Sequence, residues 1–241
     1  MIATVCGEIG PEDLGKTLMH EHLVCAMGGW ELDVDAPGPD RRSLVAMCVD
    51  RVQELQAHGY RSMVDPCPND LGRDLDLMGE VSARTGFNII AATGLYSEHM
   101  GTNAYWRIKS RLSDDFVDRL ADLMIAELKT GARNGVRAGV IKLATGTGGI
   151  TDYERKVFAA GARAALATGA PITTHTEGVL GDAQLALLAS HGVPAHRVII
   201  GHSCQSTDHG CLDGLVAAGA WLGFDRFGIE DICSDEQRVA S

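Results

Sequence analysis

Short apolar segments alternate with longer amphipathic segments along the whole chain, and this order limits the fold more than any other feature. It is typical of βα units, in which successive strands run parallel and a helix connects each strand to the next. We expect strands at 17–25, 62–67, 88–96, 138–145, 171–177, 198–203 and 221–226. We expect helices near 43–58, 73–85, 116–133, 152–168, 181–191 and 208–218. The predicted fold class is therefore α/β, a (β/α)8 TIM-type barrel in which seven strands are identifiable.

Residues with metal-binding chemistry lie near the ends of several predicted strands: His20, His22, Lys142, His175 and His202. Two residues that are two positions apart in a strand, as His20 and His22 would be, point to the same face. Neutral imidazole is the commonest protein ligand of catalytic divalent ions. Each histidine alone is more often a hydrogen-bonded core residue. The carboxyl ends of barrel strands meet at one face, however, so the set together predicts a metal site.

Lys142 is the most constraining member of this set. It follows Val140 and Ile141 in an apolar run, where a lysine is almost never buried without a partner. An ammonium ion has no lone pair for a metal, so this lysine must lose its proton, pair with a carboxylate or be covalently changed. Carbon dioxide addition to the amine gives a carbamate, which can bridge two cations. Two ions about 3.5–4 Å apart would lower the pKa of a bound water from 15.7 toward about 7.

Composition excludes several other classes of protein. The net charge of −11 argues against a nucleic-acid partner, because phosphate binding needs a basic patch. The N-terminal residues do not resemble a secretory signal, and no apolar run approaches the roughly 18 residues of a membrane span. Seven cysteines without a CxxC pair indicate reduced thiols and a cytoplasmic protein. Cys204 could be a nucleophile, but small buried packing is the more common role.

Five stretches of sequence carry a family resemblance: TVCGEIGPEDLGKTLMHEHL, IKLATG, ITTHTEG, VIIGHSCQSTD and LGFDRFGIE. In this order they resemble the phosphotriesterase family of the amidohydrolase superfamily over essentially the whole chain. The resemblance implies a distorted barrel that binds two divalent metal ions. His20 and His22 would hold the more buried ion, His175 and His202 the more exposed one, and Lys142 would bridge both as a carbamate. Zinc is the expected metal, with Mn, Co and Fe as alternatives, because nitrogen and oxygen ligands suit all of them.

The family also uses an aspartate at the end of strand eight, as a metal ligand and proton acceptor. No residue of this chain can be matched to it. We therefore expect a single hydrolase domain over 1–241 that lacks the last βα unit, so that the chain would be part of a longer protein. Ser234 is a plausible N-cap of a helix beginning in the final segment, SDEQRVAS.

The resemblance also bears on the substrate. ATGLY and FDRFG match the lactonase-like branch, which implies that Tyr96 touches the hydroxide or the substrate carbonyl and that Arg226 shapes the acyl pocket. A rim aromatic and a paired charge are the alternative interpretations of these two residues. The segment SEHMGTNAYWRIKSR is expected to form a polar loop. Its basic residues Arg107, Lys109 and Arg111 could bind an anionic substrate or could simply form a solvated face. TGTGGIT is interpreted as a flexible loop and not as a phosphate cradle.

The predicted function is hydrolysis of an ester bond by a metal-bridging hydroxide, with a lactone or related carboxylic ester as the expected substrate and promiscuous activity on phosphotriesters. Two alternatives stay open. Lys142 could form a Schiff base in an aldolase, or the chain could be a non-catalytic fragment. The expected partner is a small ester or lactone. A homodimer is an open possibility, and neither nucleic acid nor a membrane is expected.

Overall fold

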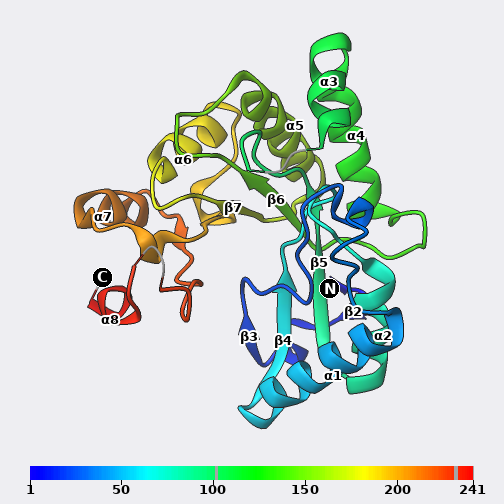
Figure 1. Cartoon of the computed structure of the whole chain (residues 1–241). Coiled ribbons are helices and arrows are strands. Elements are labelled where there is room, and N and C mark those ends of the chain that lie inside the picture. Colours follow the sequence, from blue (N-terminus) through cyan, green and yellow to red (C-terminus); the bar gives the residue numbers. More distant parts are fainter. Residues whose placement is uncertain (101–102, 231–232, 241) are drawn as a thin grey trace.

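The computed structural model describes residues 1–100, 103–230 and 233–240, and its centre is a seven-stranded parallel sheet. The strands follow one another in sequence order: β3 (Lys16–Leu18), β4 (Tyr60–Asp65), β5 (Asn88–Gly94), β6 (Val140–Ala144), β7 (Ile172–His175), β8 (Val198–Ile200) and β9 (Trp221–Leu222). Every neighbouring pair is parallel. The sheet curls as an open barrel, which confirms the predicted α/β fold class (Figure 1).

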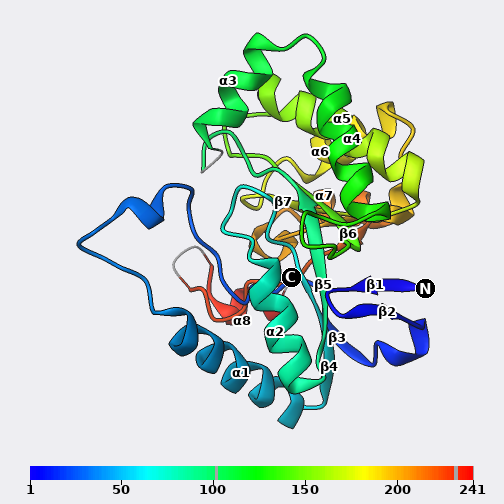
Figure 2. The same cartoon turned by 90° about the vertical axis from the view of Figure 1, so that its right-hand side faces the viewer.

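Helices connect the strands and cover the outer face of the curled sheet (Figures 1 and 2). They are α1 (Arg41–Ala57), α2 (Leu75–Thr85), α3 (Ala104–Leu112), α4 (Phe116–Lys129), α5 (Asp152–Thr168), α6 (Gly181–Ser190), α7 (His209–Ala217) and α8 (Asp235–Ala240). Short 3-10 turns lie at Pro11–Asp13, Trp30–Leu32, Ala195–Arg197 and Ser203–Gln205. Among the helices of the described ranges, none has both the length and the apolar character needed to cross a membrane.

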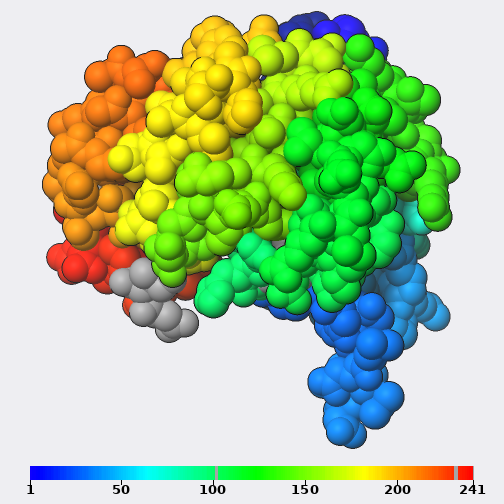
Figure 3. Space-filling model, turned by 90° about the horizontal axis from the view of Figure 1, so that it is seen from above, coloured from blue at the N-terminus to red at the C-terminus, as the bar shows by residue number. Residues whose placement is uncertain are grey.

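An antiparallel hairpin of β1 (Ile2–Thr4) and β2 (Gly7–Ile9) precedes the barrel strands. The backbone amide of Val5 donates to the carbonyl of Ile89, which ties this hairpin to β5. Residues 27–40, in the segment between β3 and α1, are exposed and project from the body of the molecule (Figures 2 and 3).

The hydrophobic core lies between the sheet and the outer helices. One cluster of buried residues includes Leu143 of β6 and Phe158 of α5, both fully buried. A second cluster includes Met63 of β4 and Val81 of α2, which are almost fully buried. Each such side chain contributes about 1.5–3 kcal/mol relative to exposure. These contacts fix the strands whose ends carry the site.

The structure differs from the predicted elements at both edges of the sheet. β3 ends at Leu18, although a strand over 17–25 was expected, and β9 contains only Trp221 and Leu222. After Leu18 the chain bends because the amide of Glu21 bonds to the carbonyl of Val64 and the amide of Leu23 bonds to a side-chain carboxylate. His20 and His22 therefore lie beyond the strand, and the prediction that they share one strand face is wrong.

The expected loop after Tyr96 is largely the helix α3. Asn103 caps this helix by accepting a hydrogen bond from the amide of Tyr105, and Trp106 packs on the core. Residues 101–102 of the expected loop lie outside the described residues. The segment has low mean hydropathy but a clear amphipathic period, which its polar composition concealed.

The expected helix at the end of the chain is confirmed as α8. The Ser234 hydroxyl accepts from the amide of Gln237, and the Gln237 side chain accepts from the amide of Ser234. This reciprocal pair is a capping box.

Two glycines permit close approaches between strands beside the predicted site. Gly94 has φ +139°, and a Cβ there would lie 1.9 Å from the carbonyl oxygen of Lys142. A Cβ at Gly201 would lie 2.1 Å from the carbonyl oxygen of Thr174. Neither contact is tolerable, so glycine at these positions lets the strand ends converge.

An open groove runs between the two edge strands. It has a volume of about 990 Å³, and its wall includes Leu18, Tyr60, Trp221 and Phe224. In the described part of the chain, β3 and β9 each pair with one neighbour in the barrel sheet. The expectation of a further βα unit remains a prediction, as does the single domain over 1–241.

Candidate metal centre

The carboxyl ends of the barrel strands bring together four of the five residues predicted as metal ligands. Lys142 is the third residue of β6, and His175 is the last residue of β7. His20 and His202 each lie two residues beyond their strands, β3 and β8. His202 adopts a left-handed conformation with φ 59°, which is uncommon outside glycine and is found at functional sites.

These four side chains form a continuous buried cluster. The Nζ atom of Lys142 lies 3.2 Å from Nε2 of His20 and 3.4 Å from the carbonyl oxygen of Thr174. Nε2 of His202 lies 2.9 Å from Nδ1 of His175. The ring centroids of His20 and His202 are 4.6 Å apart. The side-chain nitrogens of these four residues, which are potential metal ligands, therefore lie close together in one buried region.

Asp225 joins this cluster, although no sequence argument had selected it. Nδ1 of His20 lies 2.9 Å from its Oδ2, and Nδ1 of His202 donates to its Oδ1 at 2.7 Å. The amide of His202 also donates to Asp225, at 3.1 Å. The only signal in the sequence was its place near the end of the last predicted strand, 221–226, next to Arg226 in FDRFG.

Burial keeps the histidines of the cluster neutral. Desolvation lowers the pKa of His20, His175 and His202 to about 3. For Asp225, burial opposes ionisation, but the contacts from His20 and His202 outweigh it and hold the carboxyl pKa well below its usual range. Neutral imidazole beside an ionised carboxylate is the state that metal binding needs.

Lys142 is 1 % exposed, and burial lowers the pKa of its amine to about 7. Among the described residues, no carboxylate lies within ion-pair distance, 4.0 Å, of its Nζ. Of the three outcomes expected for a buried lysine, pairing with a carboxylate is thus not the one observed. Loss of the proton and covalent change remain, and the lowered pKa increases the share of neutral amine, the form that can add carbon dioxide. The donor set fits divalent ions.

His22 is directed toward different partners. Its Nδ1 lies 3.0 Å from Sγ of Cys67 and 3.5 Å from Oδ1 of Asp65. The rings of His20 and His22 have centroids 5.4 Å apart. Among the described residues, two sets of three side chains could each hold an ion: one of His20, His202 and Asp225, and one of His22, Asp65 and Cys67. Nδ1 of His22 thus faces Cys67 and Asp65, whereas His20 contacts Lys142 and Asp225. That both histidines bind one ion, as the resemblance implies, stays a prediction.

Tyr96 and Arg226 both lie at the edge of the cluster. The hydroxyl of Tyr96 is 3.2 Å from both ring nitrogens of His175. Burial raises the pKa of Tyr96, so the hydroxyl stays protonated and can donate a hydrogen bond. Arg226 donates to Oε1 of Gln205 at 2.8 Å and lies 3.5 Å from Oε2 of Glu177.

Glu177 is a second carboxylate that the sequence argument missed. Its Oε1 lies 2.6 Å from Nε2 of His175, and its other oxygen faces Arg226. The hydrogen bond from His175 is the main reason why the pKa of Glu177 is lowered. Glu177 belongs to the ITTHTEG stretch, so its spacing of two residues from His175 was available as a signal.

Comparison with known proteins identifies relatives over the whole chain. The sequence model of the phosphotriesterase family matches residues 1–241. A phosphotriesterase homology protein of Mycobacterium tuberculosis is 37% identical over 239 residues, which cover 98% of this chain and 73% of that protein. An aryldialkylphosphatase of Saccharolobus solfataricus is 30% identical over 229 residues, covering 92% of this chain and 69% of that protein.

A solved structure shows the same fold. A mutant of a PTE-like lactonase from Deinococcus radiodurans superposes with a TM-score of 0.95 at 36% identity. The match covers 100% of this chain and 76% of that chain. The predicted TIM-type barrel is thereby confirmed for the described part of the chain.

Proposed function

Because this chain belongs to the phosphotriesterase family, we propose that it is a metal-dependent hydrolase that cleaves an ester bond, with lactones as the preferred substrates. The observation that carries the proposal is the buried cluster of His20, Lys142, His175 and His202 at the carboxyl ends of the barrel strands. The printed names of relatives, an aryldialkylphosphatase and a PTE-like lactonase, support ester substrates.

The cluster, together with His22 beside His20, would hold two divalent ions, with zinc as the expected metal, through these histidines and a carbamate on Lys142. When bound, such ions make hydroxide available at neutral pH and polarise the bond to be cleaved. Carbamate formation joins the Lys142 nitrogen to the carbon of carbon dioxide and releases one proton to solvent. The lowered amine pKa supports this step, because only the neutral amine has the required lone pair.

Asp225 would orient the two histidines that it contacts. Since Nδ1 of His202 donates to the carboxylate, Nε2 of that ring carries a lone pair and faces the cluster. At His20, Nδ1 lies 2.9 Å from Oδ2 of Asp225, and Nε2 is directed at Lys142. A carboxylate behind a ligating histidine fixes its tautomer and raises its basicity. We expect Asp225 to act as a positioning residue.

Tyr96 and Arg226 would act on the substrate. A protonated Tyr96 hydroxyl beside His175 can donate to a carbonyl oxygen as negative charge develops there. Arg226, held by Gln205 and Glu177, would shape the wall of the acyl pocket.

The test is metal analysis of the purified protein together with activity on a panel of lactones and on paraoxon. We expect bound divalent metal, loss of activity with a chelator, recovery with added metal, and a higher kcat/KM for lactones than for paraoxon. Full activity in a preparation free of metal would overturn the proposal.

Tyr96→Phe keeps the aromatic ring and removes the hydroxyl. We expect kcat for lactones to fall on the order of 100-fold, the typical effect of losing one donor to a developing oxyanion. Paraoxon turnover should fall less. Tyr105→Phe, on the exposed face of α3, is the matched control and should leave both activities unchanged. Unchanged lactone turnover with reduced paraoxon turnover would assign Tyr96 to the other substrate.

A second candidate function rests on Lys142 itself. A buried amine with a pKa of about 7 is also suited to attack a carbonyl carbon and form a Schiff base, with loss of water. Borohydride reduction in the presence of an aldehyde or ketone substrate would trap this adduct on Lys142. A metal-dependent esterase should show no such adduct, so mass spectrometry separates the two functions.

A further inference from the structure

Beside the cluster at Lys142, a second group of side chains contains a thiol that the proposed hydrolysis does not use. Cys67 and Asp65 are fully buried, and the side chain of His22 is 25% exposed. One donor atom from each of the three lies within 4.8 Å of the others. A thiol, an imidazole and a carboxylate that converge in this way are all potential ligands of one ion.

The distances suit a small tetrahedral ion. Ligand atoms bound to zinc at 2.0–2.3 Å lie about 3.3–3.8 Å from one another in a tetrahedron. Nδ1 of His22 is 3.0 Å from Sγ of Cys67 and 3.5 Å from Oδ1 of Asp65. The remaining pair, the Cys67 sulfur and an Asp65 oxygen, lies within 4.8 Å, so the side chains would move closer together to reach tetrahedral distances.

Asp65 keeps both its structural role and its capacity to bind. Its oxygens accept from the amides of Leu23 and Cys67, each at 3.0 Å, which fixes the segment that carries His22. Each carboxylate oxygen has a second lone-pair direction, so these bonds do not exhaust it. The Cys67 thiol contacts the carbonyl oxygen of Val24 at 3.0 Å and the side chain of Cys25.

We propose that His22, Asp65 and Cys67 form a metal site of their own, with one thiolate ligand, suited to zinc and to thiophilic ions such as cadmium. Binding forms a bond from Sγ of Cys67 to the ion and releases the thiol proton to solvent. The site goes beyond the proposed hydrolase centre and shares only His22 with it. An imidazole that binds two ions must give up its last ring proton, so the two sites are expected to compete for His22.

Cobalt(II) is the probe, because a thiolate ligand gives it an intense near-ultraviolet charge-transfer band that nitrogen and oxygen ligands do not. Under reducing, oxygen-free conditions we expect this band in the wild-type protein and its loss in Cys67→Ser. Cadmium affinity should fall at least about tenfold in the same variant. A cobalt-loaded wild-type protein without the band would overturn the proposal, and so would a band that persists in Cys67→Ser.

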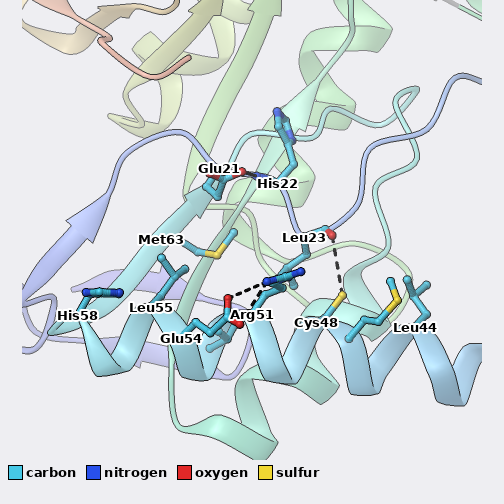
Figure 4. A pocket seen from close by; sticks show the side chains of 12 residues that line it. Glu21, His22, Leu23, Leu44, Cys48, Arg51, Glu54, Leu55, His58 and Met63 are labelled. Atoms are coloured by element: carbon cyan, nitrogen blue, oxygen red, sulfur yellow. Dashed lines mark hydrogen bonds and ion pairs between the residues drawn. The ribbon is translucent and has the colours of Figure 1, made fainter. Parts of the chain in front are cut away.

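Cys48→Ser is the matched control. Cys48 is also buried, and its thiol donates to the carbonyl of Leu23 from α1. Figure 4 shows Cys48 beneath the segment of Leu23, whereas the ring of His22 points away from α1. The band should therefore survive in Cys48→Ser. If it is lost there as well, a general disturbance of this segment would explain the result and the assignment to Cys67 fails.

His20→Ala separates this proposal from the proposed function. His20 belongs to the Lys142 cluster and is not a member of the thiolate site, so the band should remain while hydrolysis is lost. Loss of the band in His20→Ala would place Cys67 in the hydrolase centre and contradict a separate site. If Cys67→Ser does not fold, X-ray absorption of wild-type protein with one equivalent of cadmium decides. We expect at least one sulfur atom bound to the cadmium ion. A cadmium ion without a sulfur ligand would refute the site.

Discussion

Lys142→Ala is expected to lower ester hydrolysis at least about 100-fold, beyond the usual effect of losing a single partner around a metal ligand. The variant lacks the amine that would carry the carbamate, so the two ions would lose their shared ligand. Bound metal per chain should fall in parallel, as measured by elemental analysis. Because the lysine is fully buried, truncation also leaves a cavity, and stability should be followed by thermal unfolding.

Chemical rescue distinguishes lost chemistry from lost folding in this variant. The space left by the Lys142 side chain can admit a short carboxylate such as formate or acetate, which would replace the carbamate oxygens. Partial recovery of hydrolysis is expected with these acids in Lys142→Ala but not in Lys142→Met, where the longer side chain fills the space. Failure of rescue in a folded Lys142→Ala protein would count against the carbamate.

Asp225→Asn should weaken metal binding by about 10–100-fold and lower kcat correspondingly. The amide can accept only through one oxygen, whereas the carboxylate contacts both His20 and His202. One ring would lose the partner that fixes its tautomer. Asp213→Asn, an exposed position on α7, is the control and should behave like wild type.

The measurement for Asp225→Asn is a metal titration combined with kcat at saturating metal. If the role is positioning, kcat should remain reduced even when metal is restored, and Asp225→Glu should recover part of it. A variant with normal kcat and normal metal affinity would show that the observed contacts do not matter for the site.

Local sequence patterns predicted most of the barrel because each strand is a short apolar run and each helix has its own apolar face. The helix expected at 152–168 has those bounds in the structure, with Thr151 as its cap. The pattern failed after Leu18, where the strand was expected to continue to residue 25. There the amides of Glu21 and Leu23 bond to Val64 and Asp65 and do not extend the strand ladder.

In the candidate site, too, the sequence identified residues with a local signal and missed those defined by distant contacts. Lys142 was recognisable because a lysine in an apolar strand is exceptional, and the histidines because of their place at strand ends. The sequence did not single out Asp225 or Cys67, because their partners in the site are distant in the chain. Glu177 was also missed, although it lies only two residues from His175. Acidic residues after strands are common, and only the folded geometry distinguishes these.

The contact of His20 with Asp225 joins the loop after the first barrel strand to the loop after the last one, across the groove between β3 and β9. A contact between such distant parts of a chain closes a long loop, which costs conformational entropy, so we expect it to form late in folding. The transition state for folding should therefore contain the inner strands without this contact. Ligands bound there would slow unfolding and leave the folding rate nearly unchanged, so that the lifetime of the native state, more than its rate of formation, would depend on metal supply.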